Sequence, residues 1–127
     1  MSHTIGSLRS ELSRHRYIRA RVVTGSMAPL IRIGDEIVIE PIAKLSSLAK
    51  FDIVVFWDGE KPVCHYVLGH SSFAVEGEPT LLTMGLASAE LDRPVRESLI
   101  LGRVGLQMPL YYKIRETYRV WRILASS

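Results

Sequence analysis

Three side chains of this sequence form a candidate set for acyl-transfer chemistry: Ser26, His65 and Asp92. Ser26 follows the strand-like run VVTG, His65 lies inside the apolar run PVCHYVL, and Asp92 lies in the polar segment SAELDRPV. A serine hydroxyl is a weak nucleophile near neutral pH, so it needs a base, and the base needs a group that orients it. We therefore interpret Ser26 as nucleophile, His65 as general base and Asp92 as the orienting carboxylate.

Each of these residues also has a purely structural interpretation. A serine after glycine starts turns or caps helices, and an aspartate close before proline is a common turn residue. A single histidine in an apolar strand is more often a hydrogen-bonded core residue than a catalyst. The chemical interpretation depends on all three occurring in one small β domain that can bring them together.

The sequence between the termini predicts a mostly β protein. Short β-branched or alternating runs are separated by Gly-Asp, WDGEK, EGEP and Asp-Arg-Pro, which are turn sequences. The predicted strands are 18–24, 36–40, 53–57, 62–68, 72–76, 80–84 and 99–106. Their spacing predicts a compact, antiparallel, partly barrel-like sheet. We expect a basic N-terminal arm at 1–19, the catalytic β domain at 20–108, and an amphipathic C-terminal helix at 109–127.

Charge is unevenly distributed along the chain. Residues 1–21 carry five Arg against one Glu, residues 108–127 carry four Lys or Arg against one Glu, and the middle carries seven basic against eleven acidic residues. In the C-terminal segment five apolar residues fall on one helical stripe: Leu110, Ile114, Tyr118, Trp121 and Leu124. This stripe either docks on its own domain or forms a surface for an anionic membrane or an acidic partner.

Composition excludes several classes of protein. No apolar run approaches the roughly 18–20 residues of a membrane span, and no apolar core of a signal peptide follows the first basic residues. Cys64 is the single cysteine, so an internal disulfide and a cysteine-based zinc site are excluded. Basic and aromatic residues do not interleave as in nucleic-acid-binding sheets. We expect a cytoplasmic protein with no metal or cofactor and no nucleic-acid partner, in peripheral contact with a membrane if the C-terminal stripe is exposed.

Five ordered blocks resemble the type I signal peptidases. The run GSMAPLIRIGDEIVIEP is similar to the nucleophile segment of that family, and KFDIVVFW to its second strand signature. PVCHYVLG falls where the family carries its base, and His65 matches the endoplasmic-reticulum and archaeal form rather than the bacterial lysine form. TMGLASAELDR is similar to the third block, which gives Asp92 its place, and ILGRVG to the closing strand. The resemblance spans about residues 20–108.

The resemblance implies a serine endopeptidase that cleaves an extended peptide after a small residue. It assigns the oxyanion hole to the backbone N–H of Ser26 and the hydroxyl of Thr24. A substrate would pair with the strands at 21–24 and 62–64, next to Val22 and Val63. Shallow subsites beside Met27 and Cys64 would favour small side chains, although both residues are equally consistent with core packing.

Two positions depart from the pattern of that family. Tyr66 stands where the family has an arginine after the base, and Leu86 where it has an aspartate after the glycine of the third block. Both halves of one ion pair are then absent together, a change that is often nearly neutral. Three alternatives stay open: an autoprotease like the SOS-repressor C-terminal domains, a maturation protease for one dedicated partner, and a non-catalytic peptide-binding module on the same fold.

Overall fold

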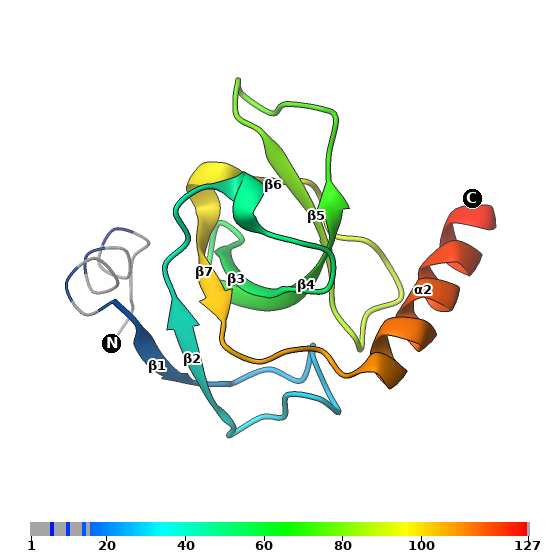
Figure 1. Ribbon diagram of the computed structural model, residues 1–127, viewed down its shortest axis with the longest axis horizontal. Coiled ribbons are helices and arrows are strands. Elements are labelled where there is room, and N and C mark those ends of the chain that lie inside the picture. The colour runs from blue at the N-terminus through cyan, green and yellow to red at the C-terminus, as the bar shows by residue number, and fades with distance from the viewer. Residues whose placement is uncertain (1–5, 7–9, 11–13, 15, 127) are drawn as a thin grey trace.

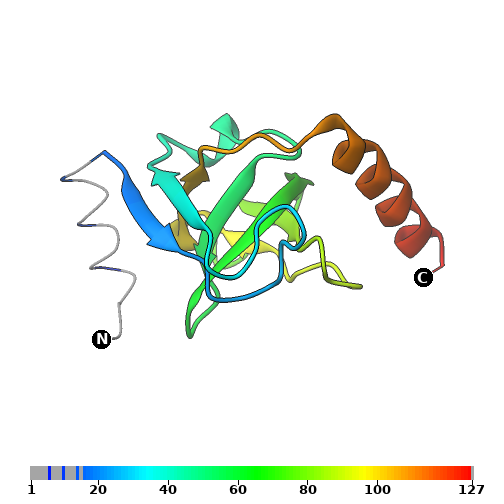
Figure 2. The same cartoon turned by 90° about the horizontal axis from the view of Figure 1, so that it is seen from below.

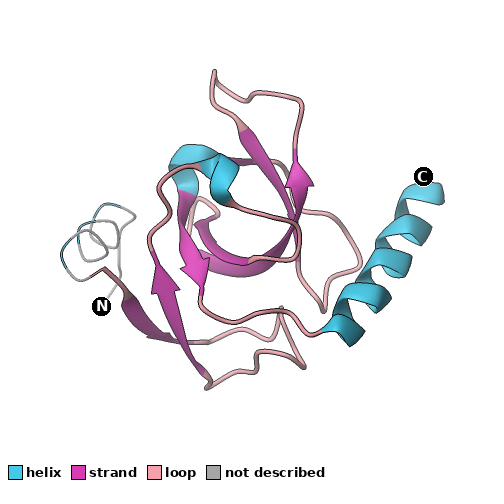
Figure 3. Cartoon of the chain, in the orientation of Figure 1, coloured by secondary structure: helices cyan, strands magenta, loops and turns pink. Residues whose placement is uncertain are grey.

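The computed structural model describes residues 6, 10, 14 and 16–126, and in this part of the chain the fold is a curled antiparallel sheet followed by a helix (Figures 1 and 3). The seven strands lie in the order β1-β2-β7-β3-β4-β5-β6. Their bounds are β1 Ile18–Arg21, β2 Glu36–Glu40, β3 Ile53–Trp57, β4 Pro62–His70, β5 Thr80–Met84, β6 Val95–Arg96 and β7 Ile100–Val104. Two short 3-10 helices, η1 Leu45–Ser47 and η2 Glu97–Leu99, and the helix α2 Leu110–Ala125 complete the description. The predicted mostly β, antiparallel, partly barrel-like class is confirmed.

The strand predicted at 18–24 ends at Arg21, so the expected pairing segment 21–24 is mostly not a strand, and the predictions were wrong at two further places. Residues 72–76 form a hairpin tip between β4 and β5, where Val75 makes an isolated bridge to Glu78 and Phe73 is 75% exposed. An exposed apolar run does not bury enough surface to behave as a strand. The two-residue strand β6, which pairs with Thr80 and Leu81 of β5, was not predicted, because so short a run carries no periodic signal.

The central strand β3 is buried on both faces, which explains why its sequence, IVVFW, is apolar without alternation. It pairs with β4 on one edge and β7 on the other. Ile53 and Val55 lie in one apolar cluster, and Val54 and Phe56 lie in a second cluster. Successive side chains of a strand point to opposite faces, so β3 supplies both clusters. Each such buried side chain contributes about 1.5–3 kcal/mol relative to an exposed one.

The expected boundaries of the three segments differ from the observed elements. β1 begins at Ile18, inside the expected arm, because Ile18 pairs with Ile39 and Arg19 with Val38 of β2. Most of the remaining arm lies outside the described residues. α2 begins one residue after the expected start at 109, and it lies at the opposite end of the molecule from β1 (Figures 1 and 2).

The apolar stripe of α2 faces outward. Tyr112, Val120 and Ile123, from a different face of the helix, pack against the larger core cluster. The exposed fractions of the predicted stripe are 71% for Leu110, 64% for Ile114, 61% for Tyr118, 64% for Trp121 and 57% for Leu124. The alternative in which this stripe docks on its own domain is therefore wrong. Among the described helices, none is long and apolar enough to cross a bilayer.

A buried carboxylate ties α2 to the sheet. The side chain of Glu116 is fully buried, and its Oε1 accepts a hydrogen bond of 2.8 Å from the hydroxyl of Tyr66 in β4. Arg119, one turn along the helix, donates from Nε to both carboxylate oxygens, at 3.1 and 3.0 Å. Burial opposes ionisation of Glu116, but the hydrogen bonds and positive charge around it outweigh burial and lower its pKa.

The lowered pKa of Glu116 predicts a loss of stability in acid. A carboxyl whose pKa falls on folding stabilises the protein above its ordinary pKa of 4.5, and this contribution is lost as pH falls through the lower folded value. Glu116→Gln weakens the charged hydrogen bonds with Arg119 and should lower the free energy of unfolding by about 1–3 kcal/mol at pH 7. Glutamine does not titrate, so the stability of this variant lacks the pH dependence that Glu116 gives the wild type. Urea unfolding from pH 7 to pH 3 should show this difference shrinking below pH 4.5. A difference independent of pH would contradict the assignment.

Candidate active site

Ser26 lies in the connection between β1 and β2, which is closed at its base. Val22 N–H donates to the carbonyl of Asp35, and Gly34 N–H donates to the carbonyl of Val22, both at 2.8 Å. The residue after the serine, Met27, is 1% exposed and packs in the larger core cluster. A flexible connection is thus fixed at its base and at its centre, and Ser26 is held next to the fixed centre.

His65 is held in the middle of β4. It pairs with Val54 of β3, its ring lies edge-on to Phe56, and it is 8% exposed. Its Nδ1 lies 2.5 Å from Oδ2 of Asp92. A proton on Nδ1 donated to this carboxylate leaves Nε2 unprotonated, which is the tautomer that a general base requires.

Asp92 is itself oriented by β5. Its backbone N–H donates to the carbonyl of Thr83 at 3.1 Å, and the hydroxyl of Thr83 donates to Oδ2 at 2.7 Å. The carboxylate is therefore fixed by one strand and faces the histidine of the neighbouring strand. The structure brings together the predicted base and the predicted orienting residue.

Gly85 is the point at which Ser26 and His65 meet. A methyl carbon placed on Gly85 would lie 2.8 Å from the carbonyl oxygen of Ser26 and 2.9 Å from Nε2 of His65. The same carbonyl accepts a hydrogen bond of 3.0 Å from Ala87 N–H. Nε2 of His65 and the backbone carbonyl of Ser26 thus both lie close to the Cα atom of Gly85.

The hydroxyl of Ser26 contacts Thr24 and the β4 residue Cys64, and not the predicted base His65. Oγ donates to the carbonyl of Cys64 at 3.3 Å and lies 3.4 Å from Oγ1 of Thr24. These are long hydrogen bonds. In enzymes without bound substrate, the hydrogen bond between nucleophile and base is often long or poorly aligned and tightens only when substrate is bound.

A groove of about 420 Å³ lies beside this serine. One wall is residues 18–24 and the other is residues 61–64. The predicted substrate residues Val22, Val63 and Cys64 line it, as does Thr24, which was predicted for the oxyanion hole. The floor consists of apolar side chains from β2, β3 and β7: Ile37, Ile39, Val55 and Leu101. Met27 does not line the groove, and its burial in the core leaves no exposed surface for the expected subsite.

The groove has a strand edge along one wall. At residues 62–64, β4 pairs with β3, whereas its register with β5 begins only at Tyr66. Within the described sheet, these three residues are therefore hydrogen-bonded as a ladder on one side only. Such an edge can accept an extended peptide as an additional strand.

Cys64 is not a second candidate nucleophile. Burial raises the pKa of its thiol to about 12, so the thiol stays protonated near neutral pH. The thiolate is the reactive form of cysteine. Cys64 therefore contributes its carbonyl and a small apolar surface to the groove.

Sequence reasoning missed the residues that hold the site together. Thr83 and Gly85 lie in the quoted block TMGLASAELDR, but their residue types alone do not reveal a contact with Asp92 or His65. No prediction was made for the residues of the groove floor. No cluster of three or more His, Cys, Asp or Glu with the geometry of a metal site occurs among the residues that the structure describes.

Comparison of the chain with models of known protein families and with curated protein sequences gave no match. The functional interpretation therefore depends on the geometry of the site and on the motif resemblance.

Gly85→Ala should impair the site more than the fold. The added methyl would lie within contact distance of Ser26 and His65, so one of them must move. A displacement of about 1 Å can lower turnover on the order of 100-fold. Gly69→Ala is the matched control, because nothing lies within 4 Å of its added carbon. The turnover and the melting temperature of both variants measure this. Equal turnover in Gly85→Ala and Gly69→Ala would show that Gly85 is not part of the site.

Proposed function

We propose that this protein is a serine endopeptidase that uses Ser26 as nucleophile, His65 as general base and Asp92 as the orienting carboxylate. The observation that carries the proposal is the contact of Asp92 Oδ2 with His65 Nδ1, together with the position of His65 Nε2 and the backbone carbonyl of Ser26, which both lie close to Gly85. A core histidine satisfied by one carboxylate would not need its second nitrogen close to the backbone of a serine whose hydroxyl contacts Thr24 and Cys64, two residues that line the groove.

The proposed reaction is ordinary acyl transfer. Nε2 of His65 accepts the Ser26 proton as Oγ attacks the peptide carbonyl, and Asp92 stabilises the resulting imidazolium. His65 then gives this proton to the leaving amine, and the acyl group stays on Ser26. A water molecule, deprotonated by His65, hydrolyses the ester and regenerates the hydroxyl.

Two donors are proposed for the oxyanion: the backbone N–H of Ser26 and the hydroxyl of Thr24. Thr24 is exposed, lines the groove, and has its Oγ1 3.4 Å from Oγ of Ser26. A donor so close to the nucleophile can contact the oxygen that becomes negative during attack. Loss of one such donor typically costs about 3–4 kcal/mol of transition-state stabilisation.

The groove supports an extended peptide as substrate. Its apolar floor accepts side chains, and the edge of β4 at 62–64 accepts the backbone. Cleavage after a small residue is proposed from the resemblance to signal peptidases. A maturation protease for one dedicated partner uses the same chemistry, whereas a non-catalytic peptide-binding module would use only the groove.

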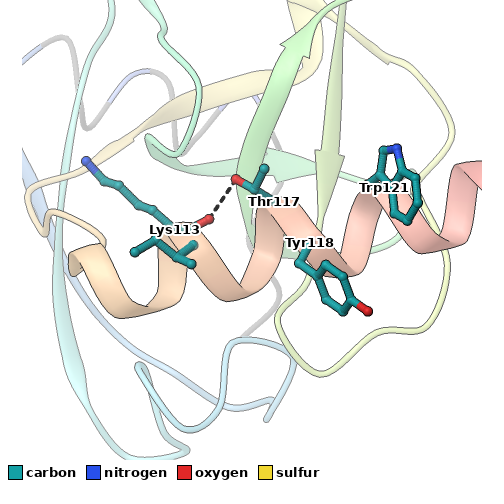
Figure 4. Close-up of a pocket in the computed structure, with 5 residues that line it drawn as sticks. Lys113, Thr117, Tyr118 and Trp121 are labelled. Carbon is teal, nitrogen blue, oxygen red and sulfur yellow. Dashed lines mark hydrogen bonds between the residues drawn. The ribbon is translucent and has the colours of Figure 1, made fainter.

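We also propose that the outer face of α2 contacts an anionic membrane. The pocket on this face is lined by Lys113, Ile114, Thr117, Tyr118 and Trp121, and Figure 4 shows the helix in front of the strands. The acidic residue of α2, Glu116, is buried and paired with Arg119. The exposed face therefore combines aromatic residues with positive charge, as interfacial helices do. The expected cytoplasmic location stays a prediction.

The first functional test is the reaction of Ser26 with a fluorophosphonate. Wild-type protein should be labelled at Ser26, as located by mass spectrometry, and should cleave extended peptides that carry alanine before the cut. Ser26→Ala should abolish labelling. His65→Ala should lower turnover by at least about 10⁴-fold, and Asp92→Asn by about 10³- to 10⁴-fold through the wrong tautomer.

A matched control for that test is His70→Ala. His70 lies at the end of β4 and contacts the carbonyl of Leu48, away from the proposed site. It should retain the wild-type labelling rate. Folded wild-type protein that is not labelled and cleaves no peptide would favour the binding module, and near-normal turnover by His65→Ala would refute the proposed base.

The membrane proposal predicts salt-sensitive binding to vesicles that contain phosphatidylserine. Lys113/Arg115/Arg122→Glu should lower partitioning at least about 100-fold, since each basic residue contributes about 1 kcal/mol near an anionic surface. Arg119 is left unchanged because it contacts the interior of the protein. Co-sedimentation at 50 mM and 500 mM salt measures the effect, which should fade as charges are screened.

The control for the vesicle test replaces the same number of basic residues by glutamate, but outside α2. Arg19/Arg32/Lys44→Glu alters three exposed residues outside α2. This variant should bind more strongly than the α2 variant. Equal loss in both variants, or no binding by wild-type protein at low salt, would contradict a role for the α2 face.

A further inference from the structure

The two departures from the signal-peptidase pattern do not leave a purely apolar contact. Leu86 and the ring of Tyr66 lie in the same core cluster, at 6% and 0% exposure. The hydroxyl of Tyr66, however, donates to Glu116 of α2 at 2.8 Å. The helix α2 therefore supplies an ion pair next to Tyr66, between Glu116 and Arg119.

Arg119 extends this ion pair to the segment after β5. Its Nη2 donates to the carbonyl of Gly85 at 3.1 Å, and its Nη1 donates to the carbonyl of Ser88. Glu116 fixes the other side of the guanidinium through Nε. One planar side chain therefore connects a fully buried carboxylate with two backbone carbonyls of the same turn.

That turn is the segment that borders the proposed active site. Gly85 lies against Nε2 of His65, and Ala87 N–H donates to the carbonyl of Ser26. A shift of Gly85 changes the space beside the imidazole, and a shift of Ala87 changes the position of the nucleophile. Arg119 holds the residues on either side of Ala87.

We propose that Arg119 and Glu116, steadied by Tyr66, are positioning residues that fix the Gly85–Ser88 turn against Ser26 and His65. This inference rests on the proposed function, and it assigns α2 a part in the active site. The role needs several N–H donors in one planar group, and not only a positive charge, because the side chain at 119 binds two carbonyls and a carboxylate at once. Lysine, with one ammonium group, cannot reproduce this geometry.

The test uses the full chain and two independent readouts. The first is hydrogen exchange of the Ala87 amide, which reports the contact with Ser26 without any chemistry. The second is the rate of fluorophosphonate labelling of Ser26 per folded molecule. In Arg119→Lys, Ala87 should exchange about 10-fold faster relative to the β3 amides, and labelling should slow by about 10- to 100-fold.

A double variant separates positioning from stability. Arg119→Leu alone would leave Glu116 buried without its main partner, which can unfold the domain. Glu116→Leu/Arg119→Leu replaces both charges together and should keep most of the stability. It should nevertheless label as slowly as Arg119→Lys. Arg122→Leu, an exposed change on the same helix, is the control and should match wild type in both readouts.

The outcomes distinguish this proposal from the proposed function. Wild-type protein that is not labelled at Ser26 would overturn the peptidase proposal, and Ala87 exchange would still decide whether Arg119 holds the turn. Wild-type labelling with an unchanged rate in Arg119→Lys and in the double variant would overturn only the positioning proposal. Unchanged Ala87 exchange in both variants would also overturn it.

Discussion

The close approach of the Gly85 backbone to Ser26 and His65 is the constraint on which the rest of the site depends. Three separate segments must meet there: the connection after β1, the strand β4, and the turn after β5. Any side chain at Gly85 would occupy the space of the imidazole or of the serine carbonyl. Burial of Met27, the ladder of β4 and the hydrogen bond from Ala87 each remove one way for these segments to separate.

A second constraint is the buried charge of Glu116. Removing a carboxylate from water costs several kcal/mol unless its oxygens are bonded, and here Tyr66 and Arg119 bond them. Tyr66 belongs to the sheet, whereas Glu116 and Arg119 belong to the helix. If α2 left the domain, the hydroxyl of Tyr66 and the carboxylate of Glu116 would therefore lose their hydrogen bond. The helix is thereby coupled to the sheet by directional contacts as well as by the packing of Val120 and Ile123.

The sequence predicted what depends on local pattern and failed where distant contacts decide. β2 and β3 have the predicted bounds. Consecutive residues alternate between polar and apolar in β2 and are all apolar in β3, so a short stretch of sequence is enough to identify each strand. The apolar stripe of α2 was found from periodicity, but periodicity left open whether it faces the domain or outward, because the contacts of Glu116 and Arg119 with distant residues decide this. Asp92 beside His65 was expected from the motif resemblance, whereas Thr83 and Arg119 act through partners far along the chain.

The strand edge at the start of β4 has a consequence for association between copies of this protein. An uncovered edge invites unwanted pairing with the edge of another sheet. Here the first residue of the edge, Pro62, has no N–H to donate, and the register with β5 begins at Tyr66. The uncovered stretch is thus short and is interrupted at its outer end. A short guest backbone fits such an edge, while a long continuous ladder between two molecules does not.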